Sequence, residues 1–170
     1  MNKAGKWGLY LVGGLLGLLV IIGVVGLFLP SHFSASASVD IHKSPQAVWD
    51  VLGNPERTKD WAGAEIQSVE FLQKTAPRRY KFTGTAGSAV YEEIVAEPAR
   101  RLKTRVVEST MGMGGTWDVR IEPVGGGSRV SVAMQMDLAN PWFRVLGSFI
   151  DPDEQERKTL LLLKNYVEAL

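Results

Sequence analysis

The chain offers few side chains that could carry covalent or metal chemistry. It contains no Cys, and its two histidines, His32 and His42, lie ten positions apart, which is not the spacing at which one strand or helix binds a metal. Two glycine-rich segments, 112–115 and 125–127, lack the Lys-Ser/Thr pair and the following helix of a phosphate-binding loop and are typical of hairpin turns. We therefore expect no metal site and no cofactor, and we assign no catalytic residue.

One acidic pair could bear on function. Glu92 and Glu93 are adjacent in an expected strand over 88–97, so their side chains point to opposite faces and cannot act together as an acid and a base. One of them must point inward. If this is Glu93, beside Tyr91, it could orient a ligand or act as a base. The alternative, which we favour, is an ion pair with an Arg that leans inward.

Period-two patterns predict the strands that would position these residues. Ala35, Ala37, Val39 and Ile41 alternate with serines and Asp40, which indicates a half-buried strand. Turn residues separate six further segments, so we expect an antiparallel meander. On its outer face, basic residues at 101, 103 and 105 would pair with charged residues at 118, 120 and 122. The six strands are expected near 65–73, 78–85, 88–97, 101–109, 115–123 and 128–138.

Capping residues predict the helices. Ser44-Pro45 and Asn54-Pro55 each begin a short helix, the first ending at Gly53 and the second near residue 61. A helical turn is expected from 141 to about 149. Asp151, followed by Pro152 and Glu154, predicts a final helix with a start like a capping box. Its apolar stripe should lie on the sheet. The stripe consists of Leu160, Leu163, Val167 and Leu170.

An uncharged stretch of 22 residues, 8–29, precedes the first strand. As a helix it would extend roughly 33 Å, the thickness of a bilayer core. Lys3 and Lys6 precede it, whereas no Lys or Arg follows it until Lys43. The positive-inside rule then places the N-terminus in the cytoplasm and the domain on the external or periplasmic side of the inner membrane. The expected organisation is a tail over 1–7, a single transmembrane helix over 8–29, a linker over 30–33 and a domain over 34–170.

Two other features of this region carry hypotheses. A cleaved signal peptide is the alternative to the anchor, because Ala35 and Ala37 form a small-x-small pattern, but the apolar run is long for a signal peptide and cleavage would remove half of the first strand. Gly13 and Gly17 have the four-residue spacing at which membrane helices pack, so a homodimer through them is a further hypothesis.

The charge balance argues against a nucleic-acid partner. The chain has 19 Lys and Arg residues and 18 Asp and Glu residues. Lys3 and Lys6 precede the apolar stretch, so the part after it has 17 basic and 18 acidic residues. A net charge of −1 gives that part no basic footprint for a phosphate backbone.

The order of strand, two short helices, six-stranded meander and long C-terminal helix resembles the helix-grip fold of the START and SRPBCC superfamily, over residues 33–170. The stretch SVDIHKSPQAVWDVLGNPERTKDW is similar to the opening strand and helices, EEIVAEPARRLKTRV to a strand-turn-strand, and GGTWDVRIEPVGGGSRVSV to the final hairpin. The segment NPWFRVLGSFI is similar to membrane-associated members of the polyketide cyclase/dehydrase and lipid-transport group.

This resemblance implies an α+β domain in which a curved seven-stranded antiparallel sheet surrounds the long C-terminal helix, with a cavity between them for an apolar molecule. We expect membrane-anchored binding of a lipid or polyketide-like ligand. The alternatives are a cyclase or hydrolase that uses Glu93 or Tyr91, and an envelope interaction module whose side chains fill a closed core. The candidate ligand-binding residues are Trp61, Tyr80, Phe82, Tyr91, Glu93, Trp117, Met134, Met136, Leu163 and Tyr166.

Overall fold

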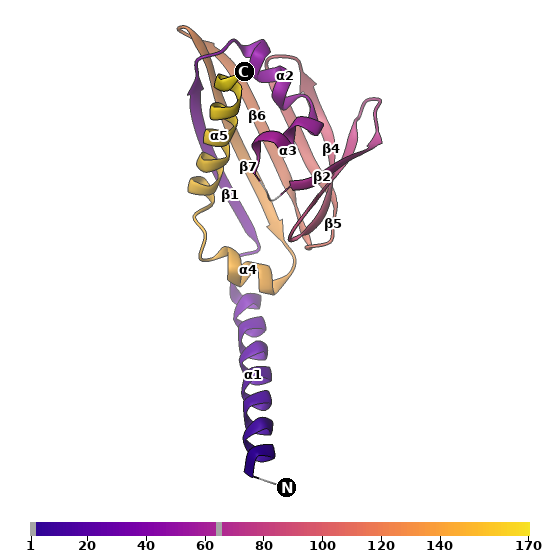
Figure 1. The fold of residues 1–170 in the computed structure, drawn as a ribbon, viewed down its shortest axis with the longest axis vertical. Helices are drawn as coiled ribbons and strands as arrows, with labels where there is room; N and C mark the ends of the chain where they lie inside the picture. Colours follow the sequence, from indigo (N-terminus) through magenta and orange to yellow (C-terminus); the bar gives the residue numbers. More distant parts are fainter. Residues whose placement is uncertain (1–2, 64–65) are drawn as a thin grey trace.

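The computed structural model describes residues 3–63 and 66–170 (Figure 1). A long helix, α1, extends away from an α+β domain and leads into its first strand. The elements follow in the order α1 (Lys3–Phe28), β1 (His32–Ile41), α2 (Pro45–Leu52), a 3-10 turn η1 (Pro55–Arg57), α3 (Thr58–Trp61), β2 (Ile66–Gln73), β3 (Arg79–Gly84), β4 (Gly87–Glu97), β5 (Arg101–Ser109), β6 (Met113–Val124), β7 (Gly127–Leu138), α4 (Pro141–Gly147) and α5 (Pro152–Ala169).

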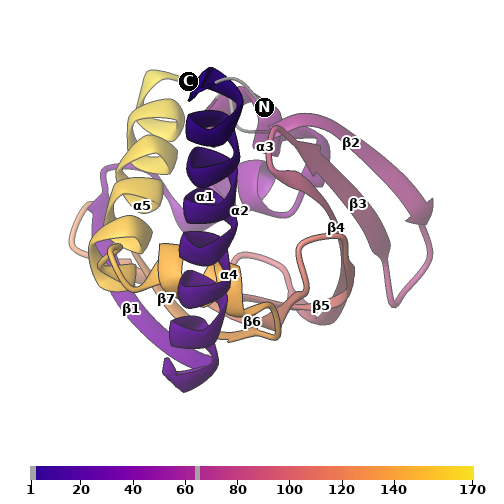
Figure 2. The same cartoon turned by 90° about the horizontal axis from the view of Figure 1, so that it is seen from below.

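The seven strands form one antiparallel sheet in the order β1-β7-β6-β5-β4-β3-β2. The first strand pairs with the last, and the other neighbours are joined by short hairpin connections. Figure 2 shows the sheet curving around α5, α2 and α3, which lie on its concave side. The fold class and the strand count expected from the sequence are thus confirmed.

A close-packed core joins α2 and α5 to the β1, β6 and β7 side of the sheet. Val48 and Val51 of α2 and Leu163 of α5 are almost completely buried there, together with Val130 of β7. The remaining buried members of this core are Ile41, Ile121, Val132, Leu160 and Val167. The stripe predicted for the last helix therefore packs as expected up to Val167, whereas Leu170 lies past the helix end and is exposed.

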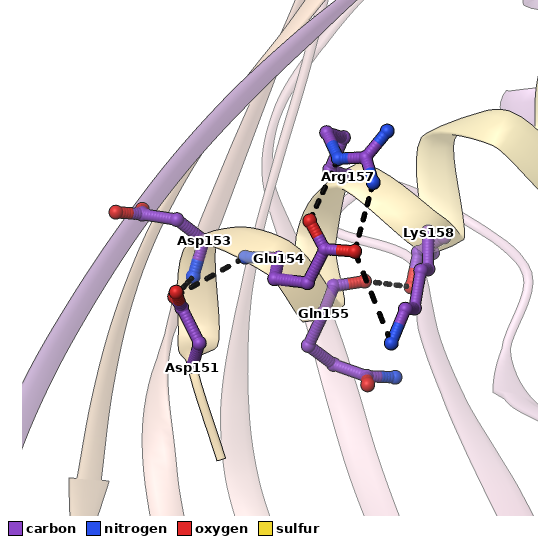
Figure 3. A network of polar contacts seen from close by, with 7 residues as sticks. Asp151, Asp153, Glu154, Gln155, Arg157 and Lys158 are labelled. Atoms are coloured by element: carbon purple, nitrogen blue, oxygen red, sulfur yellow. Dashed lines mark hydrogen bonds and ion pairs between the residues drawn. The ribbon is translucent and has the colours of Figure 1, made fainter.

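Helix starts agree with the predicted caps, with one correction. The side chains of Ser44 and Asn54 accept hydrogen bonds from backbone N–H groups two or three residues ahead. Asp151 accepts from the N–H groups of Asp153 and Glu154, at 3.0 and 3.3 Å. The capping box itself does not form, because the Glu154 carboxylate turns outward to Arg157, as Figure 3 shows. Both carboxylate oxygens of Glu154 accept from the Arg157 guanidinium, at 2.8 Å each, and such a bidentate ion pair is favoured over a single bond from the cap N–H.

Other boundaries differ by a few residues. The first strand begins at His32 and not at 34, because His32 and Phe33 pair with Asp137 and Met136 of β7 and so belong to the sheet. The sixth strand begins at Met113 for the same reason. Helix α1 takes in residues 3–7 of the expected tail. The expected strand start at residue 65, and residues 1–2 of the tail, lie outside the described residues.

The outer face of the sheet carries ion pairs, but not all the expected ones. Arg101 forms a bidentate pair with Asp118, at 2.7 and 2.8 Å, as predicted. Arg105 instead reaches Glu92 on β4, at 2.6 Å. In the register, Arg105 lies directly opposite Glu92 on one side and an uncharged Thr116 on the other, which explains the choice of partner.

Candidate functional site

Aromatic side chains gather on the concave face, from β6 beside the core to β2 at the edge of the sheet. Tyr80 and Phe82 of β3 contact Tyr91 of β4, and Tyr91 contacts Trp117 of β6, with ring centroids 5.2 to 6.2 Å apart. Phe71 of β2 joins the cluster through Tyr80. Period-two alternation places these rings on one face, and the antiparallel register sets Tyr80 directly opposite Tyr91.

A cavity of about 380 Å³ adjoins this aromatic cluster at one end of the sheet. It lies within the range of pockets that hold small molecules, roughly 300–1,000 Å³. Its walls come from the β3–β4 hairpin and from the start of β6, and they carry no ionisable group besides Tyr91. The lining residues are Ile66, Phe82, Thr83, Gly84, Thr85, Ala86, Gly87, Ala89, Tyr91, Met111 and Met113.

Glu93 points inward, as the sequence allowed, and it is paired. Its carboxylate lies 2.7 Å from the guanidinium of Arg78, and Arg78 also donates to the backbone carbonyl of Gly53, 3.0 Å away. Glu92 points outward to Arg79 and Arg105. The favoured interpretation of Glu93, an ion pair with an inward-leaning Arg, is therefore confirmed. Arg78 thus connects β4, through Glu93, to the end of α2, through the carbonyl of Gly53.

A second acidic group, Glu156 of α5, approaches the aromatic cluster from the helix side. Its carboxylate accepts a hydrogen bond from the indole Nε1 of Trp117, at 3.4 Å. Burial raises the pKa of Glu156 above its ordinary value, and the bond from Trp117 opposes this shift only in part. Burial, aided by the nearby charge of Glu156, also raises the pKa of Tyr91 to about 12.

These groups define what the site can do chemically. With a pKa of about 12, the Tyr91 hydroxyl stays protonated at neutral pH and can donate a hydrogen bond, but it is not a ready base. Glu156 can accept a hydrogen bond, whereas Glu93 is already held by Arg78. Within the described ranges, no group of three His, Asp or Glu side chains converges as a metal site would require. The arrangement suits an apolar molecule with one polar end.

The structure brings together only some of the ten residues selected from the sequence. Tyr80, Phe82, Tyr91 and Trp117 form the aromatic cluster, and two of them, Phe82 and Tyr91, line the cavity. Glu93 lies on the same face, two residues from Tyr91 along β4.

The other members of that set lie elsewhere on the concave side. Leu163, 1% exposed, is inside the core, and Met134, 4% exposed, lies opposite Trp117 in the register. Met136 lies opposite Gly115, and Trp61 and Tyr166 pack against the edge of the core. The cavity expected directly under the C-terminal helix thus lies instead toward the β3–β4 hairpin, because apolar side chains of α2 and α5 fill the space near β1 and β7.

Several site residues were missing from the sequence-based set. Glu156 lies four positions before Leu160, so the helical period alone could have placed it on the inward face of α5. Phe71 alternates with Val69 in β2 and could have been found in the same way. Met111 and Met113 line the cavity from either side of a turn, and no periodic signal identifies a residue in that position.

A larger hollow, of about 600 Å³, lies on the outer face of the sheet. Its walls include Ser36, Ser38 and Ser131 together with Asp118 and Arg120. Because these groups are polar or charged, this hollow does not suit an apolar ligand.

Comparison with known proteins gives a family match and a common fold. Residues 32–165 match the family described as polyketide cyclase / dehydrase and lipid transport. No curated protein matches the chain.

Solved structures share the architecture at low sequence identity. Protein TTHA0849 from Thermus thermophilus has a TM-score of 0.68 and 20% identity, covering 81% of this chain and 98% of that one. Major latex-like protein 151 from Panax ginseng has a TM-score of 0.63 and 16% identity, covering 82% and 97%. A Thalictrum norcoclaurine synthase point mutant, in complex with a transition-state analogue, has a TM-score of 0.60 and 12% identity, covering 80% and 94%. At these identities the likeness establishes the fold alone.

Proposed function

The chain belongs to the polyketide cyclase / dehydrase and lipid transport family, and from this premise we propose that it is a membrane-anchored protein that binds a hydrophobic small molecule on the concave face of its sheet. The observation that carries the proposal is the cavity of about 380 Å³ beside the aromatic cluster. Phe82, Tyr91, Met111 and Met113 supply apolar and adaptable walls. Tyr91 is positioned to bond a polar end of the ligand.

The anchor in this proposal is α1. It has the length and composition to cross a membrane over Tyr10–Phe28, close to the N-terminus. Most of its large apolar side chains are exposed, and among the described elements α4 packs against it at its last turns. Burying this surface in a bilayer core avoids the cost of exposing it to water. The proposed orientation keeps Lys3 and Lys6 in the cytoplasm and the domain outside.

Retention of a ligand by the purified protein tests the binding proposal. The full chain would be purified from its host membranes in mild detergent, and native mass spectrometry would measure bound apolar molecules. Ala89 lines the cavity and is buried, so Ala89→Leu should fill part of the volume and abolish retention. Ala133→Leu makes the same change on the exposed outer face and should leave retention unchanged.

The outcomes separate the competing functions. A molecule retained by the wild type and by Ala133→Leu, but lost in Ala89→Leu, supports ligand binding in this cavity. If the wild type retains nothing and binds no apolar fluorescent probe, the ligand-binding proposal is wrong and the interaction module becomes the better account.

A further inference from the structure

An uncharged apolar surface lies where α1 meets the domain. Helix α4 and residues 148–150 expose Trp142, Leu146, Phe149 and Ile150, and Phe149 is 84% exposed. Figure 1 shows α4 at the end of the domain from which α1 leaves. We call this set, together with Leu27 and Phe28 at the end of α1, the junction patch.

Close packing at two glycines determines the position at which α4 contacts α1. Gly26 is buried against α4, and a Cβ at this position would clash with the carbonyl oxygen of Pro141. A Cβ at Gly23 would lie 3.3 Å from the ring of Trp142. Gly23 comes five residues before Phe28, which corresponds to about 7.5 Å along a helix. The ring of Trp142 therefore lies beside the apolar part of α1, inward of its exit end.

The one charged side chain in this segment makes hydrogen bonds to the end of β7. Arg144 is the sole charged residue in 140–150. It donates to the backbone carbonyls of Leu138 and Ala139, at 2.7 and 3.1 Å, and so ties α4 to the end of β7. Asn140 caps the helix by accepting from the N–H of Trp142. The exposed side of α4 is left with apolar groups.

We propose that the junction patch is seated in the boundary between headgroups and acyl chains of the bilayer that α1 crosses. This inference rests on the proposed membrane anchor. If Tyr10–Phe28 spans the bilayer, the level of Gly23 lies inside its apolar part, and Trp142 is carried to that depth by its contact with Gly23. Interfacial segments are buried about 5–10 Å into this boundary, and Trp and Phe are favoured there. The one charge of the segment, the guanidinium of Arg144, is hydrogen-bonded to the carbonyls of Leu138 and Ala139 instead of joining the apolar side chains of the patch, which reduces the cost of such burial.

The position of the patch also determines which end of the cavity would face the membrane. The cavity is lined by the β3–β4 hairpin, Met111 and Met113, which lie at the end of the sheet where β7 leads into α4. The β5–β6 turn adjoins the start of α4, since the N–H of Ala139 donates to the carbonyl of Gly112 at 2.9 Å. Seating the junction patch in the bilayer therefore brings this end of the cavity to the membrane surface, where a lipid can enter with little exposure to water.

Fluorophores attached at single cysteines test the seating. Because the chain has no Cys, Phe149→Cys, Leu162→Cys and Leu16→Cys each give one labelling site on the full chain. Leu162, on α5, is the matched control, an exposed leucine away from the patch, and Leu16 reports on the middle of α1. Each variant would carry the environment-sensitive dye NBD in vesicles of phosphatidylcholine and phosphatidylglycerol, with nitroxide lipids as quenchers inside the bilayer and iodide as the quencher in water.

We expect the Leu16 label to be quenched by nitroxides near the chain ends, the Phe149 label by nitroxides near the headgroups, and the Leu162 label by iodide. If Leu16 is quenched deep in the bilayer while Phe149 behaves like Leu162, the seating is wrong and the anchor stands. If iodide also reaches Leu16, the anchor and the seating are both wrong. Protection of Phe149 without nitroxide quenching, lost when protein is diluted into excess lipid, would assign the patch to a second copy and overturn the proposal. None of these results depends on whether a ligand is retained.

Discussion

Glu156 is an ionisable residue in direct contact with the aromatic cluster, through its bond from Trp117. Burial raises its pKa above the ordinary value of 4.5, so over the pH interval between the two values the folded chain holds a proton that the unfolded chain has lost. The stability that Glu156 contributes is therefore fully present below pH 4.5 and is lost as pH rises through the raised value. At neutral pH this carboxylate opposes folding.

Glu156→Gln should reveal this linkage. The amide resembles the protonated acid and does not titrate, so the variant should match the wild type in acid and be more stable than it at neutral pH. Melting temperatures of both proteins in the same detergent, measured from below pH 4.5 to pH 8, would show the difference growing with pH. Equal stability at all pH values would mean that Glu156 is solvated as in the unfolded chain.

The ion pair of Glu93 and Arg78 is expected to matter for stability. Glu93→Gln leaves a half-buried guanidinium without its counter-charge, and breaking a buried pair from one side costs about 3 kcal/mol or more. The matched control is Arg105→Gln, which removes a guanidinium whose side chain is 54% exposed and leaves Glu92 paired with Arg79, so it should cost less than about 1 kcal/mol. Denaturant unfolding of the full chain in detergent measures both. Similar small losses would show that the inner pair is as hydrated as the outer one.

At the scale of elements, α5 holds the domain together through one face. Leu163, 1% exposed, packs in the core, while its neighbour Leu162 is 44% exposed. Leu163→Asp should cost several kcal/mol, about 3 or more, because a buried carboxylate has no partner there. Leu162→Asp should change stability by only about 0.5 kcal/mol. Thermal unfolding followed by circular dichroism compares the two. A similar effect of both variants would mean that α5 does not pack as described.

At the scale of the whole molecule, one apolar helix leads into a domain whose connecting region is also apolar. The proposed topology places the domain outside the cytoplasm, because Lys3 and Lys6 precede the apolar stretch of α1 and no Lys or Arg follows it until Lys43. A reporter fused after Leu170 that is active only outside the cytoplasm should therefore be active. Replacing both lysines with Glu should reduce or invert this activity, whereas Arg at both positions should preserve it. Activity of a cytoplasmic reporter alone would contradict the topology.

The sequence by itself determined the local structure and the family. Ser44, Asn54 and Asp151 cap helices because their side-chain oxygens satisfy free N–H groups within three residues, and this depends on nothing distant. Alternation predicted that Tyr91 and Glu93 share one face of their strand and that Glu92 lies on the other, because a strand has a period of two. Together with the order of the elements, these local signals were sufficient to identify the helix-grip fold.

Only the tertiary structure decided where the cavity lies. Trp117 and Glu156 meet across 39 positions, and Arg78 reaches both Glu93 and the carbonyl of Gly53. Periodicity says which face a side chain is on, but not which part of that face another element covers. Whether Leu163 fills the core or Met113 lines a cavity depends on where α2 and α5 dock on the curved sheet, and that docking is set by the fit of side chains that are distant in the sequence.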